Sequence, residues 1–275
     1  SALITQGIIP IAYIEDLIAI GSNSEHNFAG LYVTEGGLSK SYALIRSIDL
    51  TSGSGFTTSL INGNFSGSFE GNNHTLSNLS ISASGLNKIG LFSELTDSSI
   101  KNLTLQSFNI TGFRLVGSLG GQVSGTNNVF DNIHVSNGTI SGQQEAIGGL
   151  IGISNGNAKI VMTKITNSAN LSGSFYIGGI IGALSNSTSL TMTQITNSGL
   201  VSGSNIKIGG IIGFVGDGVK EVTMTTISNK GNVNGDDWIG GIIGSVGKRV
   251  TEVAMTVISN KGNVNGDDWI GGIIG

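Results

Sequence analysis

The sequence predicts an all-β protein, a right-handed parallel β-helix with about 31 residues in each coil and a short capping helix at its N-terminal end. Three observations lead to this fold. The hexapeptide IGGLIG at residues 147–152 recurs as IGGIIG, the four methionines keep one position in the repeat, and no segment of the repeats has helical periodicity. The successive phases begin at Val116, Ile147, Ile177, Ile208, Ile239 and Ile270.

Each repeat contains three short runs that favour strands. In residues 208–238 these runs are IGGIIGFV, KEVTMTTIS and GNVNG, and turn-forming residues separate them. The middle run alternates, with Met224 on one face and Thr225 on the other, and a shift before Ile227 predicts a bulge. Each repeat is therefore predicted to form one coil of three strands. With about 31 residues in each coil, the chain should contain roughly seven or eight stacked coils.

Methionine provides the sharpest internal test of stacking. The four methionines, spaced by 30, 32 and 31 residues, are Met162, Met192, Met224 and Met255. Because stacked coils place like residues above one another, we expect a methionine column inside a shared core rather than a metal or redox site. The residue after each methionine is a threonine, and these should form a ladder on the outer face, at Thr163, Thr193, Thr225 and Thr256.

Glycine and asparagine mark the turns. Glycine pairs such as Gly178 with Gly179 predict a tight corner that needs positive φ or close backbone approach, and single glycines recur at Gly142, Gly173, Gly203, Gly235 and Gly266. A recurrent asparagine should tolerate a left-handed turn and bond along the stack, at Asn137, Asn167, Asn197, Asn229 and Asn260. Ligand contact is the alternative for both sets.

The chain divides into three predicted parts. Residues 1–48 form a cap with a short helix at residues 10–20, where Pro10 suits a first helical turn, and a first strand begins at Tyr42. Residues 49–115 form irregular early coils, and residues 116–275 form the regular repeats. The helix is expected to cover the edge of the first coil, with Glu15 and Asp16 on a solvated face. Because the last repeat contains six residues, we expect the chain to be part of a longer array.

Composition excludes several classes of partner. Charged residues make up 11% of the 275 residues and the formal net charge is −4, so we expect neither nucleic acid nor an anionic membrane as partner. The absence of cysteine excludes disulfides and thiolate metal sites. No apolar stretch approaches the length of a membrane helix, so membrane insertion of these residues is not expected.

The sequence assigns no catalytic, cofactor-binding or metal-binding residue, and we expect no enzyme. Its three histidines, His26, His74 and His134, are spread along the chain and form no cluster. Two acidic pairs, Asp236 with Asp237 and Asp267 with Asp268, lie 31 residues apart. Stacking would bring these carboxylates together, either as a calcium site or, with greater weight, as a polar turn.

Two surface columns offer binding alternatives. Trp238 and Trp269 stand just before the glycine corner, and they form an exposed aromatic strip for glycan or protein if they point outward, or fill the corner if they point inward. The threonine ladder could match the ice lattice. Its neighbouring column, which should also be threonine for that function, contains Val161, Thr191, Thr223 and Ala254.

The repeats resemble the GLUG-motif repeats of bacterial secreted and surface proteins. Residues 149–152 match the motif as GLIG, and Gly179, Gly210, Gly241 and Gly272 each begin a GIIG variant. The segment FSGSFEGNNHTLSNL at residues 65–79 is similar to the one that introduces such arrays. The resemblance implies a right-handed β-helix, and a place in adhesins or in the non-catalytic regions of immunoglobulin-cleaving metalloproteases.

These observations predict a structural or adhesive segment of a bacterial surface or secreted protein. Its expected partners are a host or cell-surface protein or glycan, together with further coils of the same chain. A non-catalytic repeat domain of a surface metalloprotease is the second candidate, since the H-E-x-x-H zinc motif is absent from these 275 residues. An ice-binding β-solenoid is the third.

Overall fold

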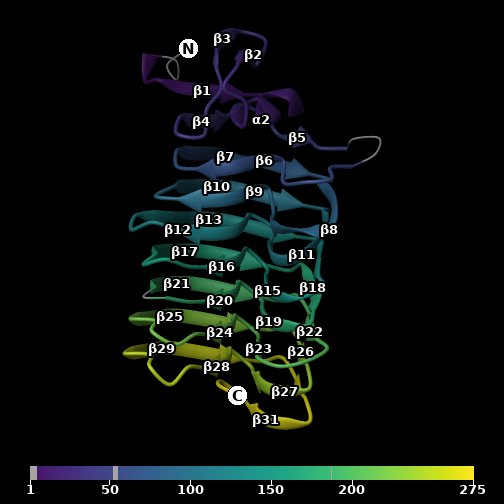
Figure 1. The fold of residues 1–275 in the computed structure, drawn as a ribbon, viewed down its shortest axis with the longest axis vertical. Helices are drawn as coiled ribbons and strands as arrows, with labels where there is room; N and C mark the ends of the chain where they lie inside the picture. Colours follow the sequence, from purple (N-terminus) through teal and green to yellow (C-terminus); the bar gives the residue numbers. More distant parts are fainter. Residues whose placement is uncertain (1–4, 52–54, 187) are drawn as a thin grey trace.

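The computed structural model describes residues 5–51, 55–186 and 188–275 and shows a stack of parallel coils that runs from the N-terminal to the C-terminal end of the chain (Figure 1). The stack is a β-solenoid of about eight turns with roughly 31 residues per turn, and helix makes up 3% of it. The predicted fold class and coil length are confirmed. Three parallel sheets run along the stack.

The long-strand sheet carries the run that contains methionine. In spatial order its strands are β1 (Ile8–Ile11), β4 (Ser41–Leu44), β7 (Ser68–Ser77), β10 (Ser99–Gln106), β13 (Asn128–Ser136), β17 (Lys159–Asn167), β21 (Ser189–Asn197), β25 (Glu221–Asn229) and β29 (Glu252–Asn260). The short β5 (Ile48–Asp49) also pairs with β7. The first strand predicted from Tyr42 is thus two short strands, and β1, which precedes it, was not predicted.

The second sheet, here called the split sheet, divides into two branches. It begins with two long strands, β8 (Ser80–Ile89) and β11 (Asn109–Gly117). One branch continues as β14 (Thr139–Gly142), β18 (Asn170–Gly173), β22 (Val201–Gly203), β26 (Val233–Asn234) and β30 (Val264–Asn265). The other contains β15 (Glu145–Gly148), β19 (Phe175–Gly178), β23 (Ile208–Gly209), β27 (Asp237–Gly240) and β31 (Asp268–Gly271).

The short-strand sheet closes each coil. Its strands are β6 (Ile61–Phe65), β9 (Phe92–Thr96), β12 (Gly120–Ser124), β16 (Ile151–Ser154), β20 (Ile181–Leu184), β24 (Ile212–Val215) and β28 (Ile243–Val246). The run IGGIIGFV, predicted as one strand, is therefore divided between β23 in the split sheet and β24 in this sheet. The prediction of three strands per repeat is wrong for these coils, because the hexapeptide bends at its glycine pair.

The methionine column lies in the core as predicted. Met162 pairs with Met192, Met192 with Met224, and Met224 with Met255, each one coil further along the long-strand sheet. The first three are fully buried, and Met255 packs against the core with partial exposure. The column continues toward the N-terminus through larger side chains, listed from the methionines outward as Phe130, Ile100, Phe69 and Tyr42. One apolar position therefore spans the length of the solenoid.

The glycine corner depends on close approach rather than on positive φ. Neither Gly209 nor Gly210 lies in the left-handed region. A Cβ atom on Gly210 would overlap the carbonyl oxygen of Gly241 in the next coil, and a Cβ on Gly209 would overlap that of Ile212. The part of the prediction that invoked positive φ is wrong here. Positive φ occurs instead at the residue two before Gly209, Lys207, where φ is 65°.

The predicted shift before Ile227 is confirmed as one left-handed residue per coil, but it is not a bulge between coils, because Thr225 and Ile227 stay in register with Thr256 and Ile258. In the last coils these residues are Lys164, Gln194, Thr226 and Val257, with φ between 54° and 58°. In earlier coils the position holds Asn102 and Asn132, and the Asn132 amide donates to Asn102 Oδ1 at 2.8 Å. Asparagine tolerates this conformation better than a β-branched residue does, so Val257 is the most strained member.

The asparagine column forms a buried hydrogen-bonded ladder. The Nδ2 of Asn167 donates to Asn197 Oδ1, that of Asn197 to Asn229 Oδ1, and that of Asn229 to Asn260 Oδ1, each at 2.9 Å. Bonding along the stack is confirmed, but none of these four residues has positive φ. Asn137 does not belong to the ladder, since Val135 is the residue in register with Asn167. Asn137 is exposed and left-handed, with φ 52°.

The N-terminal cap consists of α2 (Ile14–Ile20) and the hairpin β2 (Glu25–Phe28) with β3 (Tyr32–Glu35), which lie at the N-terminal end of the stack (Figure 1). The predicted short helix is confirmed and buries Leu17 and Ile20. Pro10 is not in its first turn but in β1, an edge strand where a missing N–H is tolerated.

Asp16 organises this cap, and its predicted solvated position is wrong. The side chain is 1% exposed. Its Oδ2 accepts hydrogen bonds from the backbone N–H groups of Ala12, Tyr13 and Ala29 at 2.8, 3.0 and 3.1 Å, and its Oδ1 lies 2.7 Å from His26 Nε2. One carboxylate therefore fixes the start of the helix and ties it to the hairpin. Its neighbour Glu15 is exposed, as predicted.

We predict that Asn197→Ala lowers the free energy of unfolding by about 3 kcal/mol, because it leaves the Asn167 amide and the Asn229 carbonyl without their buried partners. Chemical denaturation measures the change. Asn127→Ala, at an exposed asparagine that lies outside the ladder and is not left-handed, is the matched control and should change stability by less than about 0.5 kcal/mol. Equal effects of the two substitutions would contradict the ladder.

A second prediction concerns Tyr42, whose hydroxyl donates to Gly37 O at 2.8 Å and accepts from Gly37 N at 2.9 Å. Burial raises the pKa of Tyr42 from 10.0 to about 12. Because the folded pKa is the higher one, this stabilisation is complete below pH 10 and disappears as pH rises toward 12. The free energy of unfolding should fall by about 3 kcal/mol across that window relative to Tyr42→Phe. Parallel pH profiles of the two proteins would refute this.

Candidate functional site

The most distinctive surface feature is a set of aromatic residues around one lysine, here called the aromatic–lysine strip and defined as Tyr176, Lys207, Phe214, Trp238 and Trp269. Four of its members occupy one repeat position, immediately before the hexapeptide, and so follow one another along the stack. Phe214 comes from β24, on the other side of the glycine corner. The strip therefore bridges the split sheet and the short-strand sheet.

The side chains of the strip contact one another around the lysine. The rings of Tyr176 and Phe214 stack with centroids 5.0 Å apart and an interplanar angle of 30°. The Lys207 ammonium lies 3.8 Å from the Phe214 centroid and 5.2 Å from those of Tyr176 and Trp238. Trp238 and Trp269 meet edge to face at 6.4 Å. Three rings, which come from three successive coils, thus surround one cation.

The electrostatics of Lys207 follow from this enclosure. Among the described residues its ammonium has no hydrogen bond and no ion pair, and its contacts are with ring faces. Loss of hydration lowers the pKa of Lys207, and the charge of Asp217 partly opposes that shift. Burial likewise raises the pKa of the Tyr176 hydroxyl, with a further contribution from Glu145. The strip is a partly dehydrated surface that holds a cation among ring faces.

A groove of about 360 Å³ runs beside the strip. Its lining combines aromatic, hydroxyl and charged groups, from Lys207, Phe214, Asp217, Trp238, Ser245, Val246, Gly247 and Lys248. Trp238 is 39% exposed, whereas the adjacent Ile239 is fully buried. Of the two positions considered for the tryptophans from sequence, the outward one is therefore confirmed.

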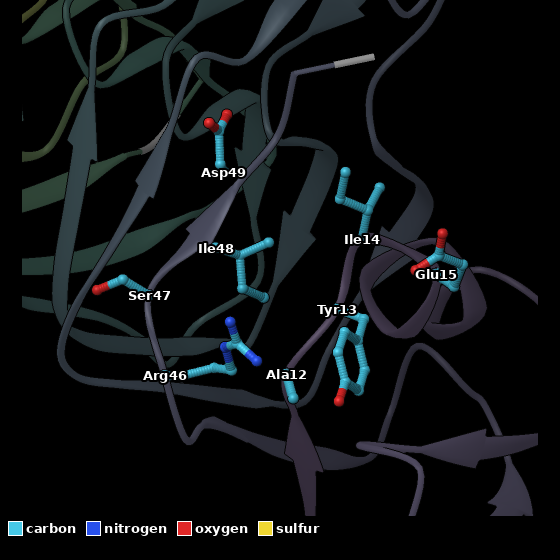
Figure 2. Close-up of a pocket in the computed structure, with 8 residues that line it drawn as sticks. All are labelled: Ala12, Tyr13, Ile14, Glu15, Arg46, Ser47, Ile48 and Asp49. Atoms are coloured by element: carbon cyan, nitrogen blue, oxygen red, sulfur yellow. The ribbon is translucent and has the colours of Figure 1, made fainter.

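A second hollow, of about 280 Å³, lies at the cap end between α2 and the segment that joins β4 to β5. Figure 2 shows Arg46 beside the Tyr13 ring, with Ile14 and Ile48 further along the wall. The Arg46 guanidinium lies 5.7 Å from the Tyr13 centroid. Hydrogen bonds from Asn78 and Thr51 lower the pKa of Asp49. Since Arg46 and Asp49 already have partners of their own, this hollow is a weaker candidate than the groove.

The acidic pairs do stack, but they do not build a cation site. Asp237 is directly in register with Asp268, and the backbone N–H of Asp267 donates to the carbonyl of Asp236 at 2.6 Å. Across residues 5–51, 55–186 and 188–275, no three His, Cys, Asp or Glu side chains lie close enough together to hold a metal ion. The calcium alternative gains no support, and the polar turn agrees with these contacts.

The three histidines remain far apart in sequence and in different strands. His26 is not the isolated surface residue that we expected, because its ring bonds to the buried Asp16 in the cap. His134 is exposed in β13, where its Nδ1 lies 2.8 Å from Thr166 Oγ1. His74 is half-buried in β7. The three histidines therefore form no cluster.

The threonine ladder lies on the outer face of the long-strand sheet, in register from coil to coil. Thr163, Thr193 and Thr225 are half-buried, and Thr256 is exposed. The adjacent column is in register too, but it holds valine and alanine as well as two threonines, as the sequence showed. Ice binding stays a prediction that the contacts neither support nor exclude.

Comparisons with known proteins agree with the solenoid. No protein-family model matches the chain. Halomucin from Haloquadratum walsbyi is 40% identical over 109 residues, which make up 39% of this chain and 1% of halomucin. The chain thus corresponds to a very small part of that relative.

The fold has a counterpart among solved structures. The crystal structure of a "putative immunoglobulin A1 protease" from Bacteroides ovatus superposes with a TM-score of 0.65 over 96% of this chain and 84% of the other, at 16% sequence identity. At that identity the likeness concerns the fold alone. Within the part of the chain that the structure describes, no helix is long and apolar enough to cross a bilayer.

The enclosure of Lys207 leads to a measurable prediction. By NMR titration its ammonium should have a pKa below 10.5, the ordinary value for lysine, because the surrounding rings exclude water. Phe214→Ala should move that pKa back toward 10.5, whereas Phe108→Ala, a substitution away from the strip, should leave it unchanged. If Phe214→Ala leaves the pKa of Lys207 unchanged, the rings do not exclude water from its ammonium group.

Proposed function

We propose that residues 1–275 form a structural and adhesive segment of a secreted or surface protein, which projects from its attachment point and presents the aromatic–lysine strip. The observation that carries the proposal is the strip itself, in which the exposed Trp238 lies beside the half-buried rings of Tyr176 and Phe214 on an otherwise regular solenoid. Soluble proteins seldom expose clustered aromatic side chains without a partner. The similarities to halomucin and to the Bacteroides ovatus protein point to a surface or secreted setting.

The repeat architecture suits a projecting role. Each coil contacts its neighbours through the same register, so coils can be added without changing the fold. Residues 227–244 and 258–275 are identical, as expected after recent duplication of a coil. The resemblance of the repeats to GLUG-motif repeats also supports a projecting, adhesive role. We further propose that these residues carry no hydrolase activity of their own.

A second candidate is a non-catalytic repeat domain of a surface protease. The likeness to the Bacteroides ovatus protein over 96% of this chain favours it, although it concerns the fold alone. In that case the catalytic zinc motif belongs to another part of the parent protein. A segment of this kind would extend the protein away from its attachment point and contact the substrate or a surface. Its role in binding would be the same as that of the adhesive segment proposed above.

Bead adhesion tests the proposal. Beads coated with residues 1–275 should attach to cell layers, and the double substitution Trp238→Asn with Tyr176→Asn should reduce attachment at least about tenfold. Asparagine suits the positive φ at these positions, so the fold should remain intact. Val257→Asn, which changes a left-handed residue of the long-strand sheet, is the matched control. Beads coated with this variant should attach as those coated with the unchanged protein do. Attachment that never exceeds that of uncoated beads would contradict an adhesive role.

A further inference from the structure

The strip retains bulky residues in a backbone conformation that disfavours them. Tyr176, Lys207, Trp238 and Trp269 have φ of 54°, 65°, 59° and 55°. A non-glycine residue in this region costs free energy, and glycine or asparagine would fit better. The conformation itself does not require an aromatic ring, since Lys88, Leu115 and Ala146 adopt it at the same position of earlier coils, with φ of 60°, 57° and 63°. The aromatic side chains therefore serve something other than the corner.

The chemistry of the groove selects an oxygen-rich ligand. The Lys207 ammonium has three N–H donors that, within the described residues, meet only ring faces. Lys248 also lines the groove, and the carboxylate of Asp217 lies 3.6 Å from the guanidinium of Arg249. The lining therefore has two lysines against one acid that is already paired, in a chain whose net charge is −4. A carboxylate would complete the coordination of Lys207.

The arrangement of the rings points to a linear polymer of flat units. Lys207 and Trp238 are one coil apart, as are Trp238 and Trp269, and coils are separated by about 4.8 Å. A chain of pyranose rings laid along the solenoid meets one of these positions at each coil. Sugar C–H groups pack on ring faces, and sugar hydroxyls bond to polar groups on the groove walls.

We propose that the groove beside the aromatic–lysine strip binds an acidic carbohydrate, with pyranose rings packed on Trp238 and Trp269 and a sugar carboxylate bonded to Lys207 and Lys248. The inference rests on the proposed adhesive function and gives its ligand a chemical class. The cation sets the preference for acidic over neutral sugars, and the rings set the affinity. Added salt should weaken the binding because an ion pair is part of it.

Intrinsic fluorescence tests the inference directly, because Trp238 and Trp269 are the two tryptophans of the chain. The probes are oligomers of galacturonic acid, oligomers of sialic acid, and the methyl esters of the galacturonic acid oligomers, which have lost the charge. At least one acidic series should shift and quench the emission to saturation. Its affinity should exceed that of a matched neutral sugar at least about tenfold, a difference of about 1.4 kcal/mol.

Three variants assign the signal to the groove. Trp238→Asn removes a platform while relieving positive φ, so it should keep or raise the thermal midpoint and weaken binding at least about tenfold. Lys207→Gln should abolish the preference for acidic over neutral sugars. Val257→Asn, which relieves the same kind of strain on the long-strand sheet, should bind as the unchanged protein does.

The outcomes separate this inference from the broader proposal. Saturable quenching that requires Lys207 and Trp238 supports an acidic carbohydrate ligand. Equal binding of neutral and acidic oligomers overturns the role of Lys207. If no acidic oligomer changes the emission at millimolar concentration while coated beads still attach to cells through the strip, the carbohydrate inference is wrong and the adhesive function stands.

Discussion

Every coil of this protein is bonded to a near copy of itself, and this constraint governs the rest of the structure. Parallel pairing fixes the coils about 4.8 Å apart and in register, so each side chain lies against its own counterpart. In the later coils, a residue type recurs at a core position when it packs well on itself. Met192 between Met162 and Met224 satisfies that rule by shape, and Asn197 satisfies it because an amide donates to one neighbour and accepts from the other. Carboxylates cannot do so, and Asp237 and Asp268 accordingly lie at the surface turn.

The same constraint turns single backbone features into columns. One left-handed residue per coil bends the long-strand sheet, and another precedes the glycine corner. In the first column, Asn102 and Asn132 show the solution that favours stability, since asparagine accepts the conformation and bonds along the stack. The second column holds Lys207 and Trp238 instead, which gain no such bond. The first column also holds residues without such a bond, Lys164, Gln194, Thr226 and Val257, so a left-handed residue alone marks no ligand site. Only the second column gathers aromatic rings around a cation.

Most of the fold could be predicted from the periodicity of the sequence. This is because stacking places equivalent residues of successive coils in similar environments. The methionine spacing was enough to place one column in the core. Features that depend on contacts outside the period could not be found in this way. Asp16 looked like a surface acid on a helix, and its burial depends on Ala29 and His26, which arrive from the hairpin. The division of the hexapeptide depends on how closely Gly210 approaches the next coil, which residue type alone leaves open. The two tryptophans of the aromatic–lysine strip were predicted from the sequence, but the place of Lys207 in the strip was not. Lys207 and Phe214 meet across a corner that joins two sheets, and the repeat pattern does not show this contact.

Methyl NMR of the protein labelled at its methionines examines the stacking most directly. The account predicts nuclear Overhauser contacts between the methyl groups of Met162 and Met192, Met192 and Met224, and Met224 and Met255, and no direct contact between Met162 and Met255. The first three methyl groups should also be shielded from a soluble paramagnetic agent, since their side chains are fully buried. Methionine methyl groups that show no mutual contacts, or that broaden together when the agent is added, would contradict a solenoid built by stacking like upon like.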